Sequence, residues 1–234
     1  MDLKTWKALI AELVGTFALI YIGVCAIANF HGVSGGLLGI ALAHGLAIAV
    51  MVSATGAISG GHLNPAVTVG AWVADRIECK TAIAYILAQL TGSLMAALCA
   101  YLSFSGLYLY DHNIGGDIVA NGTPALGSGT GPLRGMLIEA ILTFFLVFVV
   151  FGTGIDSRGP KIGGLAIGLT VTMDILAGGP LTGAAMNPAR FFGPSVAAER
   201  WDNWIVYWVG PLVGGIVAGV VYGQSLLKEE PKGK

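Results

Sequence analysis

Two Asn-Pro-Ala triplets are the residues whose types and spacing point most clearly to chemistry. They are Asn64-Pro65-Ala66 and Asn187-Pro188-Ala189. Asparagine is a favoured N-cap residue, and proline suits the first turn of a helix. A glycine-rich stretch precedes each triplet, at 59–63 and 178–183, and glycine permits non-helical backbone. Each triplet therefore predicts an extended, irregular segment that turns into a capped helix.

The chemistry of such helix starts follows from their charge. A helix N-terminus behaves as roughly +0.5 elementary charge, so two of them facing each other would repel cations, hydronium included. Each asparagine can cap through its oxygen and still direct an amide N–H into the space between the helices. A water molecule that accepts from both amides cannot easily donate along a file of waters. The pair thus predicts a point at which proton hopping is interrupted.

Two glutamates, Glu12 and Glu139, lie in strongly apolar stretches of the chain. A carboxyl group in a membrane is costly without partners. We expect both to be structural, each accepting hydrogen bonds from the free backbone N–H groups of one irregular segment.

The elements that must position these residues are long and apolar. The chain is 55% hydrophobic and 11% charged, against about 25% charged in soluble domains. A helix needs about 20 apolar residues to cross a bilayer. Six stretches approach that length, at 8–28, 35–55, 82–103, 135–153, 162–178 and 204–226. They predict an all-α membrane protein with one transmembrane domain, 1–234.

The two halves of the chain resemble each other. Gly45 and Gly168, Gly60 and Gly183, and the two triplets share an offset of 123 residues. Each half holds three spans, an odd number, so the second copy must be inverted in the membrane. We place repeat 1 at about 8–103, repeat 2 at about 135–226, and a linker loop at 104–133.

The apolar run after the first triplet is short. It ends at 74–76, after about ten residues or ~15 Å of helix, which is half of a ~30 Å bilayer core. Two such half-helices would meet at mid-membrane. Irregular backbone at that depth is tolerated only where it lines a watery cavity, so the pattern predicts a pore.

The charge distribution predicts orientation. Nine of the twelve Lys and Arg residues fall on the side that holds both termini, which places the termini in the cytoplasm. Short loops favour a prokaryotic plasma membrane. The three cysteines indicate no disulfide framework. We expect no cofactor, no metal ion and no nucleic-acid partner.

The sequence resembles the aquaporin, or major intrinsic protein, family from Ala11-Glu12 to Gly210-Pro211. The resemblance rests on His-Leu-Asn-Pro-Ala-Val-Thr at 62–68 and Met-Asn-Pro-Ala-Arg at 186–190. It implies a right-handed bundle of six transmembrane helices plus two half-helices. It also implies a homotetramer in membrane lipid, with one pore per subunit.

The resemblance implies a selectivity filter at His44, Ile175, Ala184 and Arg190, a set similar to that of plant tonoplast intrinsic proteins. That similarity makes a vacuolar membrane the alternative to a prokaryotic plasma membrane. Arg190 would reject cations. Ile175 is apolar where water-selective members often carry a second histidine, so we expect water first, and ammonia or another small neutral solute as well. The expected pore lining adds His62, and also Ile48 and Val171, which share the offset of 123 residues.

Two alternatives stay open. A glycerol or urea facilitator is one, although Phe191 replaces the Asp typical of glycerol channels and also departs from the small residue of water channels. A secondary transporter would share the inverted repeat but needs an ion carrier at mid-membrane. An intramembrane enzyme is not expected, because no catalytic pair stands out.

Asp174, beside Ile175, is expected either in solvent at the outer mouth or paired with a filter donor such as His44.

Overall fold

The computed structural model describes residues 3–30, 32–104, 108–109, 112–113, 120 and 122–227. Six helices in it are long and apolar enough to cross a membrane. They are α1 (Leu3–Phe30), α2 (Gly36–Ser59), α4 (Cys79–Phe104), α6 with η1 (Pro132–Val150, Phe151–Ile155), α7 (Gly163–Thr182) and α9 with η2 (Trp204–Ala218, Gly219–Leu226). All six predicted spans are confirmed, and most are longer than predicted.

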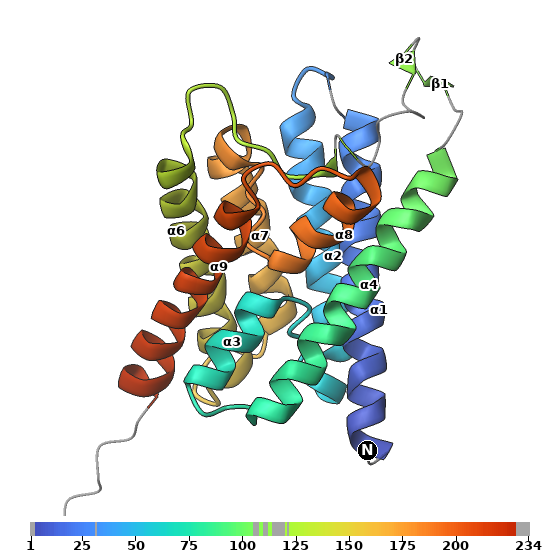
Figure 1. The fold of residues 1–234 in the computed structure, drawn as a ribbon. Helices are drawn as coiled ribbons and strands as arrows, with labels where there is room; N and C mark the ends of the chain where they lie inside the picture. Colours follow the sequence, from blue (N-terminus) through green and yellow to red (C-terminus); the bar gives the residue numbers. More distant parts are fainter. Residues whose placement is uncertain are drawn as a thin grey trace, which may run out of the picture.

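Two shorter helices follow the Asn-Pro-Ala triplets, α3 (Pro65–Val73) and α8 (Pro188–Ala198). They enter the bundle from opposite ends, and their N-termini point toward each other at its middle (Figure 1). The start of α1 and the end of η2 lie at the same end of the molecule (Figure 1). This is the predicted all-α architecture of six long helices and two half-helices.

The predicted linker is described only in part. Residues 105–107, 110–111, 114–119 and 121 lie outside the described residues, as do 228–234 with three of the counted lysines. The described part contains β1 (Tyr108–Leu109), which pairs antiparallel with β2 (His112–Asn113), and an ordered stretch at 122–131. The repeat limits stay a prediction.

The long helices pack in pairs, α2 on α7, α1 on α4 and α6 on α9. α2 and α7 approach each other closely at Gly45 and Gly168, the glycines that share an offset of 123 residues. A Cβ at Gly45 would lie 2.6 Å from the Gly168 carbonyl oxygen, well inside the usual contact distance of about 3.5 Å. The following residues, Leu46 and Leu169, are 59% and 57% exposed. In each repeat, the glycine of this pair thus allows the two helices to approach closely, and the leucine contributes to the apolar outer surface.

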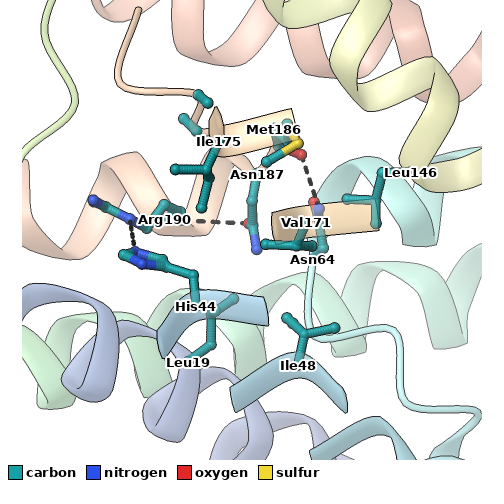
Figure 2. A pocket seen from close by; sticks show the side chains of 12 residues that line it. Leu19, His44, Ile48, Asn64, Leu146, Val171, Ile175, Met186, Asn187 and Arg190 are labelled. Carbon is teal, nitrogen blue, oxygen red and sulfur yellow. Dashed lines mark hydrogen bonds between the residues drawn. The ribbon is translucent and has the colours of Figure 1, made fainter. Parts of the chain in front are cut away.

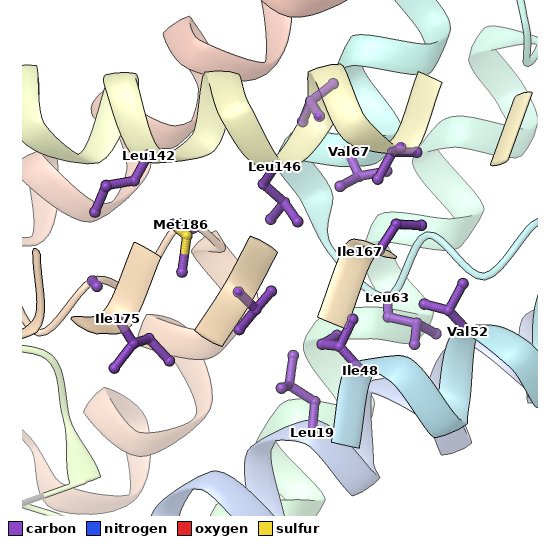
Figure 3. Close-up of a cluster of buried hydrophobic side chains, with 14 of the residues drawn as sticks. Leu19, Ile48, Val52, Leu63, Val67, Leu142, Leu146, Ile167, Ile175 and Met186 are labelled. Carbon is purple, nitrogen blue, oxygen red and sulfur yellow. The ribbon is translucent and has the colours of Figure 1, made fainter. Parts of the chain in front are cut away.

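The buried hydrophobic side chains converge on the centre of the bundle. Leu19 of α1, Ile48 of α2, and Leu142 and Leu146 of α6 face the same region as Ile175 of α7 (Figure 3). This cluster surrounds the place where α3 and α8 meet, so it forms the wall of the site described next.

Candidate functional site

The irregular segments before α3 and α8 are short and strained. Left-handed backbone occurs at corresponding positions: Gly60, Gly61 and Leu63 in one segment, and Gly183, Ala184 and Met186 in the other. Non-glycine residues rarely adopt such angles, and they concentrate at functional sites. The expectation of extended backbone is therefore wrong at these six positions, whereas Asn64 and Asn187 are extended. The glycine-rich stretch 178–182 is also helical, because α7 continues through Pro180 to Thr182.

Glu12 holds the first segment. Its carboxylate accepts from the backbone N–H groups of His62 (2.9 Å) and Leu63 (2.7 Å). The Ser59 hydroxyl (2.6 Å) and the Gln89 amide (2.7 Å) add two donors. Four donors match the roughly four acceptor sites of a carboxylate, so this fully buried side chain is fully hydrogen-bonded.

Glu139 holds the second segment in the same way. It accepts from the backbone N–H groups of Ala185 (2.9 Å) and Met186 (2.7 Å), and from the Thr182 hydroxyl (2.7 Å). No residue in the described part of the chain donates a fourth bond, so the two glutamates differ in how well they are satisfied. Both have the backbone partners that the sequence led us to expect.

The two asparagines cap their helices and also join them. Asn64 Oδ1 accepts from Ala66 N (2.8 Å), and Asn187 Oδ1 accepts from Ala189 N (2.9 Å). Asn64 Nδ2 donates to the Met186 carbonyl (2.9 Å), and Asn187 Nδ2 donates to the Leu63 carbonyl (3.0 Å). Each amide thus uses one of its two hydrogens across the repeat boundary, which leaves one hydrogen for the central space.

A narrow cavity of about 30 Å³ lies beside both asparagines (Figure 2). It has room for about two water molecules. The expected residues that line it are His44, Ile48, Asn64, Val171, Ile175, Ala184, Asn187 and Arg190. Leu19, Leu146, Ala185 and Met186 also line it and were not predicted. Leu19 and Leu146 each come seven residues after one of the two glutamates, a periodicity that could have identified them.

Arg190 and His44 are hydrogen-bonded to each other at one end of this cavity (Figure 2). Arg190 Nε donates to His44 Nε2 (3.3 Å), and Arg190 Nη1 donates to the Gly122 carbonyl (2.5 Å). His44 Nε2 is therefore an acceptor. Its Nδ1 must carry the proton that is donated to the Ile40 carbonyl (2.9 Å). Both ring nitrogens of His44 are hydrogen-bonded. At this end of the cavity, the N–H donors left for a solute therefore belong to the Arg190 guanidinium.

His62 lies near the cavity but is not among its lining residues. Its Nδ1 is 3.1 Å from Thr68 Oγ1, and its ring edge packs against Tyr85. Because the Thr68 hydroxyl donates to the Asn64 carbonyl (3.0 Å), His62 Nδ1 is the donor and Nε2 is left as an acceptor. Its role as pore lining stays a prediction.

Both expectations for Asp174 are wrong. The residue is 1% exposed, so it is not solvated, and His44 bonds Arg190 and Ile40 instead. Asp174 Oδ2 is buried, and no hydrogen bond from the described residues reaches it. Val171 and Ile175 line the cavity from the same helix, whereas Asp174 is not among the lining residues.

Phe191 takes part in packing. It is fully buried and stacks on Tyr207 with ring centroids 4.7 Å apart. Tyr207 in turn donates to the Thr182 carbonyl (3.0 Å). Phe191 therefore packs, through Tyr207, against the end of α7 just before the second irregular segment. Its side chain is not among those that line the cavity.

Six spans, two half-helices meeting at their N-termini and a narrow cavity between them define a multi-pass α-helical membrane channel. The family model described as major intrinsic protein matches residues 1–222, and the chain belongs to that family. It is accordingly a channel and not an enzyme.

Curated relatives and a solved structure agree. Aquaporin TIP4-4 of Zea mays is 46% identical, over 92% of this chain and 85% of the relative. Probable aquaporin TIP3-2 of Arabidopsis thaliana is 41% identical, over 94% of this chain and 84% of the relative. The aquaglyceroporin from Plasmodium falciparum superposes with a TM-score of 0.81 at 26% identity, over 95% of this chain and 97% of that one.

Proposed function

We propose that this chain is a passive channel that conducts water in single file and excludes protons and ions. The observation that carries the proposal is the pair of asparagine caps, Asn64 and Asn187, beside a cavity only about 30 Å³ in volume. The relatives that are 46% and 41% identical are named aquaporins, which supports water as the solute.

Exclusion of protons and cations rests on the centre of the cavity. Two helix N-termini raise the electrostatic potential there, and each amide has one N–H left to donate to water. The opposing walls are apolar, formed by Leu19, Ile48, Leu146 and Val171. Waters in the file therefore find donors at the asparagines and few competing partners elsewhere.

Selection among solutes rests on His44, Ile175, Ala184 and Arg190, which we propose as the filter. Arg190 contributes a fixed cation with free donors. Ile175 and Ala184 contribute apolar surface, so we expect the filter to pass a small neutral solute such as ammonia in addition to water. Glycerol or urea as the main solute is the second candidate, and the similarity to an aquaglyceroporin keeps it open.

A secondary transporter is a poorer candidate. It would need a carboxyl at mid-membrane that gains and loses an ion or a proton. Glu12 accepts four hydrogen bonds, two of them from backbone N–H groups of the first irregular segment, so its carboxylate is committed to holding that backbone. The buried carboxylates are better suited to supporting the backbone than to carrying charge.

We further propose a homotetramer in membrane lipid, with both termini in the cytoplasm. The exposed apolar side chains along the long helices offer surface for lipid and for neighbouring subunits. The comparisons do not support a prokaryotic plasma membrane, since the two relatives named above come from plants. Imaging a fluorescent fusion would identify the membrane.

A stopped-flow osmotic assay in proteoliposomes tests the proposal. We expect fast shrinkage with a low activation energy under a sucrose gradient. Parallel gradients of ammonia, urea and glycerol separate the two candidate solute classes. Shrinkage no faster than bare lipid, or glycerol entry faster than water exit, would reject the water-channel proposal.

A further inference from the structure

Gly23, on α1, lies directly behind the ring of His44. A Cβ at position 23 would lie 2.8 Å from His44 Cδ2 and 2.9 Å from Cε1, and nearer still to Nε2. Ordinary carbon contacts are about 3.5–4.0 Å. The ring therefore occupies the space that every residue other than glycine would fill with its side chain.

The position of the ring matters because His44 borders the cavity and Gly23 touches the ring from α1. The Nδ1 bond to Ile40 and the bond from Arg190 hold the ring in place. A Cβ on α1 would push the ring away from α1. Buried neighbours in a close-packed interior rarely give way freely, whereas the cavity that His44 lines offers room for the ring.

The residue after Gly23 contacts the other partner of Arg190. A Cβ added at Gly122 would lie 2.9 Å from Val24 Cγ1, so Val24 packs against the residue whose carbonyl accepts from Arg190. Val24 is fully buried. One short segment of α1 therefore supports both acceptors that hold the Arg190 guanidinium, His44 Nε2 and the Gly122 carbonyl.

We propose that Gly23 is a specificity-determining positioning residue, which seats His44 against α1 and so sets the position of Arg190 and the width of the filter. This inference rests on the proposed filter function of His44 and Arg190. Gly23 contacts no solute and acts through the imidazole ring. Substitution by alanine would displace the ring toward the cavity and distort its hydrogen bond with Arg190.

The test compares G23A, H44A and the double variant G23A/H44A, with G56A as the matched control. A Cβ at Gly56, on the exposed surface of α2, would meet nothing within 4 Å. Water and urea permeability are measured per folded subunit in proteoliposomes. We expect G23A to lower water permeability at least about fivefold, which corresponds to a permeation barrier raised by about 1 kcal/mol, the lower end of typical overpacking energies. G56A should leave the water permeability unchanged.

The double variant shows whether the ring transmits the effect. We expect H44A to admit more urea, and G23A/H44A to match H44A, because the ring that alanine would displace is absent. An equal loss from G23A with and without His44, or no loss in either, would overturn the inference. If H44A itself left water and urea permeability unchanged, the filter proposal would fail instead.

A folding defect in G23A is also informative. If G23A fails to insert and G23A/H44A inserts at the wild-type level, the clash is with the ring, as proposed. If both fail to insert and H44A alone succeeds, the obstruction comes from elsewhere on α1 and the inference is wrong.

Discussion

Asn64 and Asn187 each donate a hydrogen bond to the backbone carbonyl just before the other asparagine, at 2.9 Å to Met186 and 3.0 Å to Leu63. This reciprocal bond ties the two inverted halves together where the half-helices meet. It also fixes the direction of the second N–H of each amide. The geometry of the centre is therefore set by the two repeats jointly, and each half depends on the other.

Replacing Asn187 by aspartate keeps the cap acceptor and removes both N–H donors. It also adds a negative charge beside the cavity. A unit charge about 4 Å away, at an effective dielectric constant of about 20, changes the energy of a cation by about 4 kcal/mol. We expect proton or sodium flux to rise by about two orders of magnitude or more. A pH-sensitive dye inside proteoliposomes measures it, and flux equal to that of the wild type would contradict this role for Asn187.

Replacing the buried glutamates by glutamine should destabilise the protein unequally. An amide NH₂ would face donors that now bond a carboxylate, and each buried donor left unsatisfied costs about 1–3 kcal/mol. Glu12 accepts four bonds and Glu139 accepts three, so Glu12→Gln should lower the unfolding temperature more. Thermal unfolding in detergent measures both variants. The reverse order would show that bond count does not govern their contribution.

The loop after η1 predicts a dependence of stability on acid pH. Asp156 accepts from the backbone N–H of Arg158 (2.9 Å), from its Nε (2.9 Å) and Nη2 (2.8 Å), and from the Tyr222 hydroxyl (3.2 Å). The hydrogen bonds from Arg158 hold the pKa of the Asp156 carboxyl below its ordinary value. The stabilisation is therefore present above the unfolded pKa of about 3.9 and is lost as pH falls toward the lower folded pKa.

Asp156→Asn should accordingly lower the unfolding temperature at neutral pH, and its difference from the wild type should shrink below about pH 4. The exposed Asp202, replaced in the same way, serves as the control and should cause little change at either pH. A deficit of Asp156→Asn that stays constant from pH 7 to pH 3 would rule out the carboxylate as its cause.

Asp174 gives a prediction of no change. Because it neither lines the cavity nor bonds His44, Asp174→Asn should leave the water permeability and its pH profile as in the wild type. The neutral amide should also be tolerated well by the buried site, since it removes an ionisable group that has an unpartnered oxygen. A shifted pH profile would mean that Asp174 acts on the filter after all.

The sequence predicted the parts of this protein that depend on local pattern. Span length gave the six helices, and the Asn-Pro pairs gave the two caps. The repeat offset related Ile48 to Val171, and both line the cavity. The spacing from the buried glutamates relates a second pair, because Leu19 follows Glu12 and Leu146 follows Glu139 by seven residues.

The parts that were missed depend on contacts between distant residues. The bond between His44 and Arg190 spans 146 positions in the sequence and exists only once α2 and α8 are packed. Left-handed backbone at Leu63 and Met186 is imposed by the glutamate that each N–H must reach, so no local propensity indicates it. Asp174 was misplaced because its neighbour Ile175 faces the cavity, and residues adjacent on a helix face different directions.

We expect one and the same cavity to conduct water and, at its paired asparagine caps, to stop protons. Measuring water efflux and proton flux on the same proteoliposomes, under an osmotic and then a pH gradient, tests it most directly. The expected result is water efflux well above that of bare lipid, with proton flux equal to that of bare lipid. Water efflux no faster than bare lipid, or a proton flux that rises with the amount of protein, would contradict it.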